Sequence, residues 1–158
     1  MSASKMKTIQ KNQSGVVILE VLVSIVIFAV GVLGIVGLQT VTAKAGIDAR
    51  FRTEAAALAD ELVARAQIWS NPATLATNFQ GDTNVTTYVP SGGTEFLAWF
   101  NNRLALAGTG LPRARGTVTF PAAYAGGGIL MTVQIFWQAP GSEFPAAHTT
   151  VAALPGGG

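Results

Sequence analysis

An apolar segment near the N-terminus limits what this chain can fold into more than any other feature. Residues 16–38 form a run of 23 residues that contains one charged side chain, Glu20, and no proline. As an α-helix the run would be about 35 Å long, which is enough to cross the roughly 30 Å hydrocarbon core of a bilayer. We therefore expect residues 16–38 to span a membrane.

The residues before this segment are basic. Residues 1–15 contain Lys5, Lys7 and Lys11 and no Asp or Glu. Because cytoplasmic flanks are enriched in Lys and Arg, we expect the N-terminus in the cytoplasm and the rest of the chain outside. Without these lysines, seven Lys and Arg stand against eight Asp and Glu. The positive charge of the chain therefore belongs to its first residues and does not indicate a nucleic-acid-binding protein.

A helical pattern continues beyond the apolar segment and acquires one apolar face. Its apolar residues recur at intervals of three and four, at Ile47, Phe51, Ala55, Leu58, Leu62, Ala66 and Trp69. Charged residues occupy the other positions, as in a helix that packs on a protein core. Pro72 ends the pattern, because the residue before a proline avoids the helical conformation. We expect one helix over residues 16–69, roughly 80 Å long.

The sequence after residue 69 predicts a small domain. Residues 72–93 are expected to form a connecting loop with one helical turn near 73–79. A short packing helix is expected over 94–107, with Thr94 as its N-cap and Gly108 as its stop.

Alternation of apolar and polar residues then predicts strands. It runs over residues 117–120 and 129–138, and the glycine-containing segment 121–128 suits a turn between antiparallel neighbours. Residues 148–154 are expected to add a third strand. The predicted fold class is α+β, with a long N-terminal helix packed on a small C-terminal antiparallel sheet. Trp99 and Trp137 are expected in its core, and the chain contains no cysteine for a disulfide.

Glu20 is the unusual residue of the apolar segment. A charge at the centre of a membrane helix costs on the order of 2.5–3.5 kcal/mol, so such residues are generally paired or functional. Gly15 lies five residues earlier and ends the lysine-bearing leader. Cleavage after Gly15 would make Val16 the first residue, with its positive amine about one helical turn from the Glu20 carboxylate. A charged pair at an apolar tip can set the register between neighbouring subunits.

These residues resemble the type IV prepilin family, which has a short basic leader, a glycine, a glutamate five residues later and a long apolar helix. The matching stretch is Ser14-Gly15-Val16-Val17-Ile18-Leu19-Glu20-Val21-Leu22-Val23. It departs from the family at Val16 and Val17, where Phe and Thr are most frequent. The resemblance implies that a prepilin peptidase cuts after Gly15 and methylates Val16. It also implies that Glu20 pairs with the N-terminal amine during docking.

Within the family, the segment Gly31-Val32-Leu33-Gly34-Ile35-Val36-Gly37-Leu38-Gln39 looks like that of PilV-type minor pilins. The C-terminal half is also similar, through Trp99, Leu111-Pro112, Val118 and residues 132–137. The resemblance implies a subunit that joins the pilus or its tip and supports pilus biogenesis or adhesion. It implies no enzymatic activity and no cofactor. Gly31, Gly34 and Gly37 have two readings, as close-packing positions or as places where the helix loosens inside a filament.

The resemblance also implies partners and location. The expected partners are other major and minor pilins, the prepilin peptidase and the inner-membrane assembly platform. The precursor would lie in the inner membrane with its head in the periplasm, and the mature chain in the pilus at the cell surface. The expected parts are the leader 1–15, the membrane and filament-core helix 16–38, its amphipathic continuation 39–69 and the head 70–158.

Other readings remain open. A type II secretion pseudopilin shares the N-terminal motif, and Arg113 and Arg115 would contact phosphates in a DNA-binding minor pilin. A membrane-tethered periplasmic enzyme or binding domain would use the helix only as an anchor. Ala43-Lys44-Ala45 matches the cleavage rule of a secretory signal, although the apolar run is longer than such signals usually are. His148 is expected at the surface, and no metal site or catalytic residue is expected.

Overall fold

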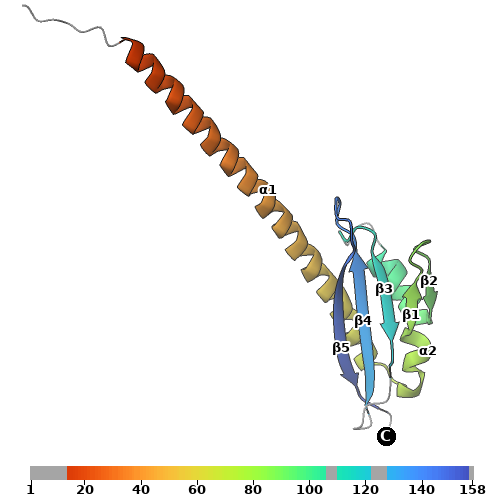
Figure 1. Ribbon diagram of the computed structural model, residues 1–158. Helices are drawn as coiled ribbons and strands as arrows, with labels where there is room; N and C mark the ends of the chain where they lie inside the picture. Colours follow the sequence, from red (N-terminus) through yellow and green to blue (C-terminus); the bar gives the residue numbers. More distant parts are fainter. Residues whose placement is uncertain (1–13, 106–109, 122–127, 157–158) are drawn as a thin grey trace, which may run out of the picture. The chain divides into compact units, whose positions relative to one another are not determined.

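The computed structural model describes residues 14–105, 110–121 and 128–156. They form one long helix, several short helical segments and a sheet (Figure 1). The long helix α1 (Ser14–Gln67) begins and ends two residues before the predicted bounds. The chain divides into two compact units, Met1–Ala45 and Gly46–Gly158, and α1 contributes residues to both. The α+β fold class is confirmed.

The second unit contains a five-stranded antiparallel sheet with the strand order β2-β1-β3-β4-β5. Its strands are β1 (Gly81–Thr83), β2 (Pro90–Gly92), β3 (Arg115–Thr119), β4 (Ile129–Trp137) and β5 (Ala146–Leu154). The two strands predicted from alternation correspond to β3 and β4, and the third predicted strand corresponds to β5. Strand β4 lies between the other two, with Val133 opposite both Val118 of β3 and Thr150 of β5.

Strands β1 and β2 fall in the region that was predicted to be a loop, and that part of the prediction is wrong. The side chain of Asn84 closes the turn between them, since its Oδ1 accepts hydrogen bonds from the backbone N–H groups of Thr86 and Thr87, both at 2.9 Å. Such side-chain bonds favour a turn. Each strand has only three residues, which is too short to show an alternating pattern.

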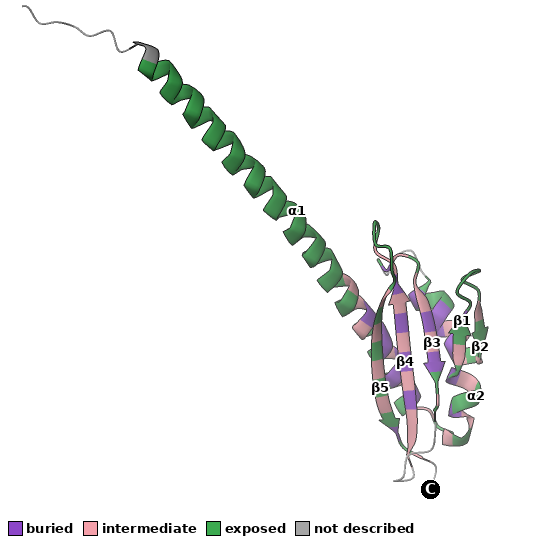
Figure 2. Ribbon diagram, in the orientation of Figure 1, coloured by how far each residue is buried: buried purple, intermediate pink, exposed green. Residues whose placement is uncertain are grey.

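The core lies between one face of the sheet and the C-terminal part of α1 (Figure 2). From α1 it receives Ala55, Leu58, Ala59, Leu62, Val63 and Ala66, and from β4 it receives Met131, Val133, Ile135 and Trp137. The predicted alternation of β4 is therefore confirmed. Ile47 was expected in the same apolar stripe but is 50% exposed, because it lies two helical turns before Ala55, the first buried residue of α1.

Short helical segments cover the same face beside α1. They are η1 (Pro72–Thr74), α2 (Leu75–Phe79), α3 (Thr94–Trp99) and the π-helical turn η2 (Phe100–Leu104). The first two confirm the helical turn predicted near 73–79. Phe96 and Trp99 of α3 are fully buried, as a packing helix requires.

Thr94 does not cap α3. The N-cap is Gly93, and Thr94 is the first helical residue, with its hydroxyl 3.0 Å from Oδ1 of Asn78. A Cβ at position 93 would overlap the backbone of Thr77 and Asn78, so the close approach of α2 requires glycine there. The predicted helix stop, Gly108, lies outside the described residues, as do residues 106 and 107.

Candidate functional site

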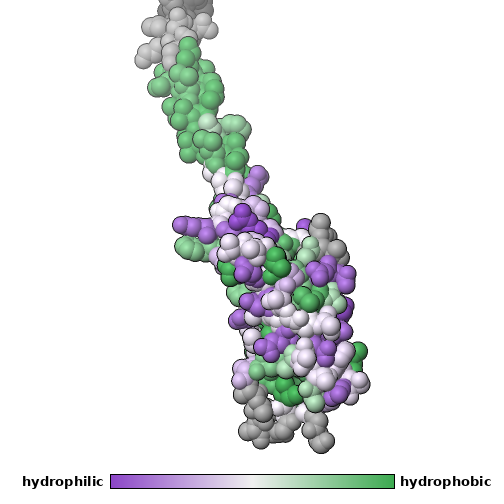
Figure 3. Space-filling view, turned by 90° about the vertical axis from the view of Figure 1, so that its right-hand side faces the viewer, coloured by the Kyte–Doolittle hydropathy of each residue, from purple (hydrophilic) through white to green (hydrophobic). Residues whose placement is uncertain are grey.

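The N-terminal part of α1 presents an apolar surface that nothing in the described chain covers. Every described side chain from residue 16 to residue 50 is exposed (Figure 2). Figure 3 shows the visible face of the first part of this segment as hydrophobic, whereas the part toward residue 50 also carries hydrophilic residues. Of the helices that the structure describes, α1 alone is long and apolar enough to cross a membrane, and no part of its most apolar window is buried. An apolar surface of this extent is typical of a membrane or protein interface.

Glu20 lies on this surface without a cationic partner among the described residues. Its side chain is exposed, and it shares a shallow, open depression on the helix with Val21, Ser24, Ile25 and Phe28. The backbone carbonyl of Glu20 accepts a hydrogen bond of 2.7 Å from the hydroxyl of Ser24. Within the described part of the chain, this carboxylate therefore lies among mostly apolar neighbours with no ion pair.

The predicted cleavage position lies in the first turn of α1. Ser14, Gly15 and Val16 are helical, while residues 1–13 of the predicted leader lie outside the described part of the chain. Cleavage and methylation therefore stay predictions.

The glycines of the apolar segment are not required by contacts within this chain. A Cβ at Gly31, Gly34 or Gly37 would meet no atom within 4 Å. Each glycine weakens a helix by about 1 kcal/mol relative to alanine. Both explanations of their presence, close packing against another helix or loosening of this one, therefore concern an assembled state.

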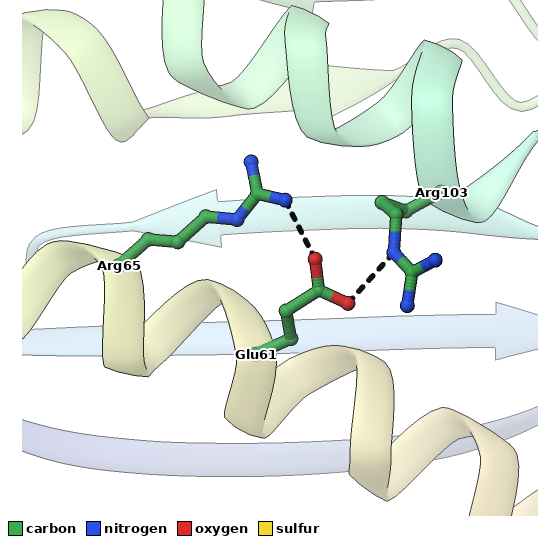
Figure 4. Close-up of polar contacts among 3 residues, drawn as sticks. All are labelled: Glu61, Arg65 and Arg103. Atoms are coloured by element: carbon green, nitrogen blue, oxygen red, sulfur yellow. Dashed lines mark hydrogen bonds and ion pairs between the residues drawn. The ribbon is translucent and has the colours of Figure 1, made fainter.

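Within the second unit, Gly46–Gly158, which is called the head from here on, an ion-pair cluster connects α1 to η2 (Figure 4). The Glu61 carboxylate accepts from Nη2 of Arg65 at 2.7 Å and from Nε of Arg103 at 2.8 Å. The spacing of four residues between Glu61 and Arg65 could have revealed the first pair from sequence. No sequence signal relates Glu61 to Arg103, because they lie 42 residues apart. All three side chains are partly exposed, so these ion pairs add little to the stability of the fold.

Arg113 and Arg115 each contact a side chain of the head. The Arg113 guanidinium donates to Oε1 of Gln138 at 3.1 Å, and its backbone has a φ of 52°. The Arg115 guanidinium lies 4.9 Å from the centre of the Phe136 ring, a cation–π contact. Both side chains thus have partners within the head, and their contact with DNA stays untested.

His148 is half-buried on β5, where Nε2 lies 3.1 Å from the hydroxyl of Thr150. In the described parts of the chain, no three His, Asp or Glu side chains gather as metal ligands would.

No protein-family model matches this sequence, and neither a curated protein nor a solved structure shows significant similarity to it. The architecture itself is pilin-like, since a long apolar N-terminal helix continues into the core of a head with an antiparallel sheet. The apolar part of that helix is consistent with membrane anchoring.

Proposed function

We propose that this chain is a minor pilin of the PilV type, which joins a type IV pilus or its tip through the N-terminal part of α1 and supports pilus biogenesis or adhesion. The observation that carries the proposal is the change of environment along α1. Its side chains are exposed from residue 16 to residue 50, whereas Ala55, Leu58 and Leu62 are buried in the head. A plain membrane anchor needs no such continuity with the core of the domain that it carries.

The apolar part of α1 needs two successive environments under this proposal. Lipid surrounds it in the precursor, and the helices of neighbouring pilins replace the lipid in the filament. Replacement of lipid by neighbouring helices brings no large gain in hydrophobic free energy, because lipid tails are as apolar as the helix surface. Specific polar contacts therefore matter for assembly, and Glu20 is the charged group of the segment that can make one.

Glu20 would pair with the N-terminal amine that cleavage before Val16 creates. A carboxylate and an amine that both leave water are costly unless they meet, since an unpaired buried charge costs about 3–5 kcal/mol. Such a pair would favour one register of the entering helix. The proposal assigns the chain no catalytic activity and no cofactor.

The replacement Glu20→Leu tests this role. In a plain anchor it makes the segment more apolar, so insertion and function should be kept. In a pilin it removes the partner of the terminal amine. We expect the variant to be inserted and cleaved normally but to be missing from pili sheared from the cells. Glu20→Gln should give an intermediate amount, because an amide oxygen accepts a hydrogen bond without balancing the charge.

Ser24→Leu is the matched control, because Ser24 lies one turn further on the same face and carries no charge. Immunoblots of sheared pili and membranes should show this variant in the pili. Normal amounts of processed Glu20→Leu in the pili would contradict the assembly role.

A type II secretion pseudopilin remains the alternative, since it would use the same N-terminal residues. The two functions separate in a deletion strain, which would lose pili in one case and protein secretion in the other. A DNA-binding pilin would instead show salt-dependent DNA binding that replacement of Arg113 and Arg115 abolishes.

A further inference from the structure

The two edges of the sheet differ in how they are protected. Strand β2 forms one edge with three residues, one of which is Pro90. Strand β5 forms the other edge with nine residues. It pairs with β4 one to one, from Ala146 opposite Trp137 to Leu154 opposite Ile129, and no bulge interrupts this register. Short length, proline and bulges are the usual means of preventing a sheet edge from pairing further, and β5 has none of them.

The free edge of β5 also lacks charge and cover. Residues 146–154 include no Lys, Arg, Asp, Glu or Pro, while Pro145 and Pro155 stand just outside the strand. No loop or side chain among the described residues hydrogen-bonds to its backbone from the side away from β4. In an antiparallel pair, alternate residues direct their N–H and C=O groups away from the neighbour. The edge therefore offers a row of unpaired backbone donors and acceptors.

The side chains of β5 do not block access to these unpaired backbone groups. The residues of β5 on the face away from α1 are Ala147, Thr149, Val151 and Ala153, all of which are exposed and short. Such side chains do not obstruct an added strand, and they are neutral. Binding of this kind takes its affinity from main-chain hydrogen bonds and its specificity from the alternating side chains.

The strand order identifies what can occupy the edge. In an antiparallel sheet of five strands, both edge strands run in the same direction, and in Figure 1 this is also the direction of the C-terminal part of α1. Copies of this chain whose heads point in the same direction, as we propose for subunits of one filament, could therefore offer β5 only parallel edges. One of these is the three-residue β2, and parallel pairing is the weaker kind. The exclusion of a second copy of this chain rests on the proposed function, whereas the open edge of β5 does not.

We propose that the free edge of β5 binds an extended, uncharged segment of a different protein chain, which adds to the sheet as an antiparallel sixth strand. The segment can have up to about nine residues in register, because prolines bound the strand at both ends. The side chains of this segment should be neutral. On the face where β5 presents Thr149 and Val151, small or β-branched side chains of the segment would fit beside them.

Hydrogen exchange on the full-length protein in detergent micelles tests this binding. The probe is a synthetic peptide in which Thr and Val alternate, with one terminal lysine at each end for solubility. Bound peptide should slow exchange of the outward-facing amides of β5 by about tenfold at a peptide concentration ten times its Kd. The amides of β4 already pair on both sides, so their exchange should not change.

Two charge variants locate the effect. Val151 on β5 is 61% exposed and Val85 in the turn between β1 and β2 is 66% exposed, so Val151→Lys and Val85→Lys add the same charge at equally open positions. Protection should be lost in Val151→Lys and kept in Val85→Lys and Val151→Thr. Unchanged exchange of β4 in each variant would show that the head is folded.

Two results would overturn the proposal. In one, no β5 amide is protected up to the solubility limit of the peptide. In the other, the protein without peptide dimerises through β5 and Val151→Lys abolishes the dimer, so that a second copy occupies the edge. Neither measurement depends on piliation, and failure here leaves the role of Glu20 to its own test.

Discussion

At the scale of single residues, Gly81 determines how closely α3 approaches the sheet. A Cβ on Gly81 would overlap Cδ1, Cγ and Cε1 of the Phe96 ring. Phe96 is fully buried and contacts the ring of Phe100, with the two ring centres 6.2 Å apart. The ring therefore cannot move aside without disturbing its neighbours. The absence of a side chain at Gly81 thus makes room on the sheet for the Phe96 ring of α3.

Gly81→Ala should consequently destabilise the head by about 1–3 kcal/mol, the usual cost of an extra methyl group in a packed core. Denaturant unfolding of the full-length protein, followed by fluorescence of the tryptophans, would measure it, since Trp99 and Trp137 are buried in the head. The control is Gly46→Ala on α1, where a Cβ meets nothing within 4 Å and helix propensity favours alanine. Equal stability of the two variants would refute the packing of Phe96 on Gly81.

At the scale of elements, α1 changes its role along its length. Leu62 is fully buried, with 0% of its surface exposed, and belongs to the core cluster with Val133 and Ile135 of β4. Ile47 has the same apolar character and lies in the same stripe, but it precedes the packed part of the helix. Two apolar residues of the same helix thus contribute differently to stability, because Leu62 packs into the core and Ile47 does not.

Leu62→Ala should cost roughly 2–5 kcal/mol in the free energy of unfolding, because it removes buried methyl groups and leaves a cavity. Ile47→Ala should change it by less than about 0.5 kcal/mol, as for an exposed position. The same unfolding experiment measures both variants. A cost for Ile47→Ala as large as that for Leu62→Ala would mean that the buried part of α1 begins earlier.

The elements that could be predicted from the sequence are the ones with long periodic patterns. Helix α1 and strand β4 have enough residues to show a period of 3.6 or two, and both were predicted to within two residues. Strands β1 and β2 have three residues each. They pair with each other across the Asn84 turn, and β1 also pairs with the distant strand β3. The open edge of β5 depends on strand order, which no local pattern contains.

The candidate site likewise has a part that local sequence patterns predict and a part that depends on distant segments. Gly15 and Glu20 could be identified from their spacing to the leader and the apolar run, because those features are local. The contact of Glu61 with Arg103 joins segments that meet only in the folded head. The amine that would meet Glu20 exists only after cleavage before Val16, so the uncleaved chain does not display it.

At the scale of the whole molecule, the chain combines two units with opposite requirements. Residues 16–38 expose an apolar surface that water does not favour, while the second unit, Gly46–Gly158, buries its own core. A subunit of this kind suits storage in a membrane and later transfer into a filament. Under the proposed function, that transfer would require removal of the lysine-bearing leader, which carries three positive charges next to the apolar segment.

Mass spectrometry of the mature N-terminus tests the central claim most directly. Protein purified from cells that contain a prepilin peptidase should begin at methylated Val16 and retain 143 of the 158 residues. Replacement of Gly15 by a bulky residue should leave the full precursor in the membrane. A mature chain that begins near Gly46 would instead identify a secretory signal, and an uncleaved chain beginning at Met1 would identify a plain anchor. Either result would contradict a pilin.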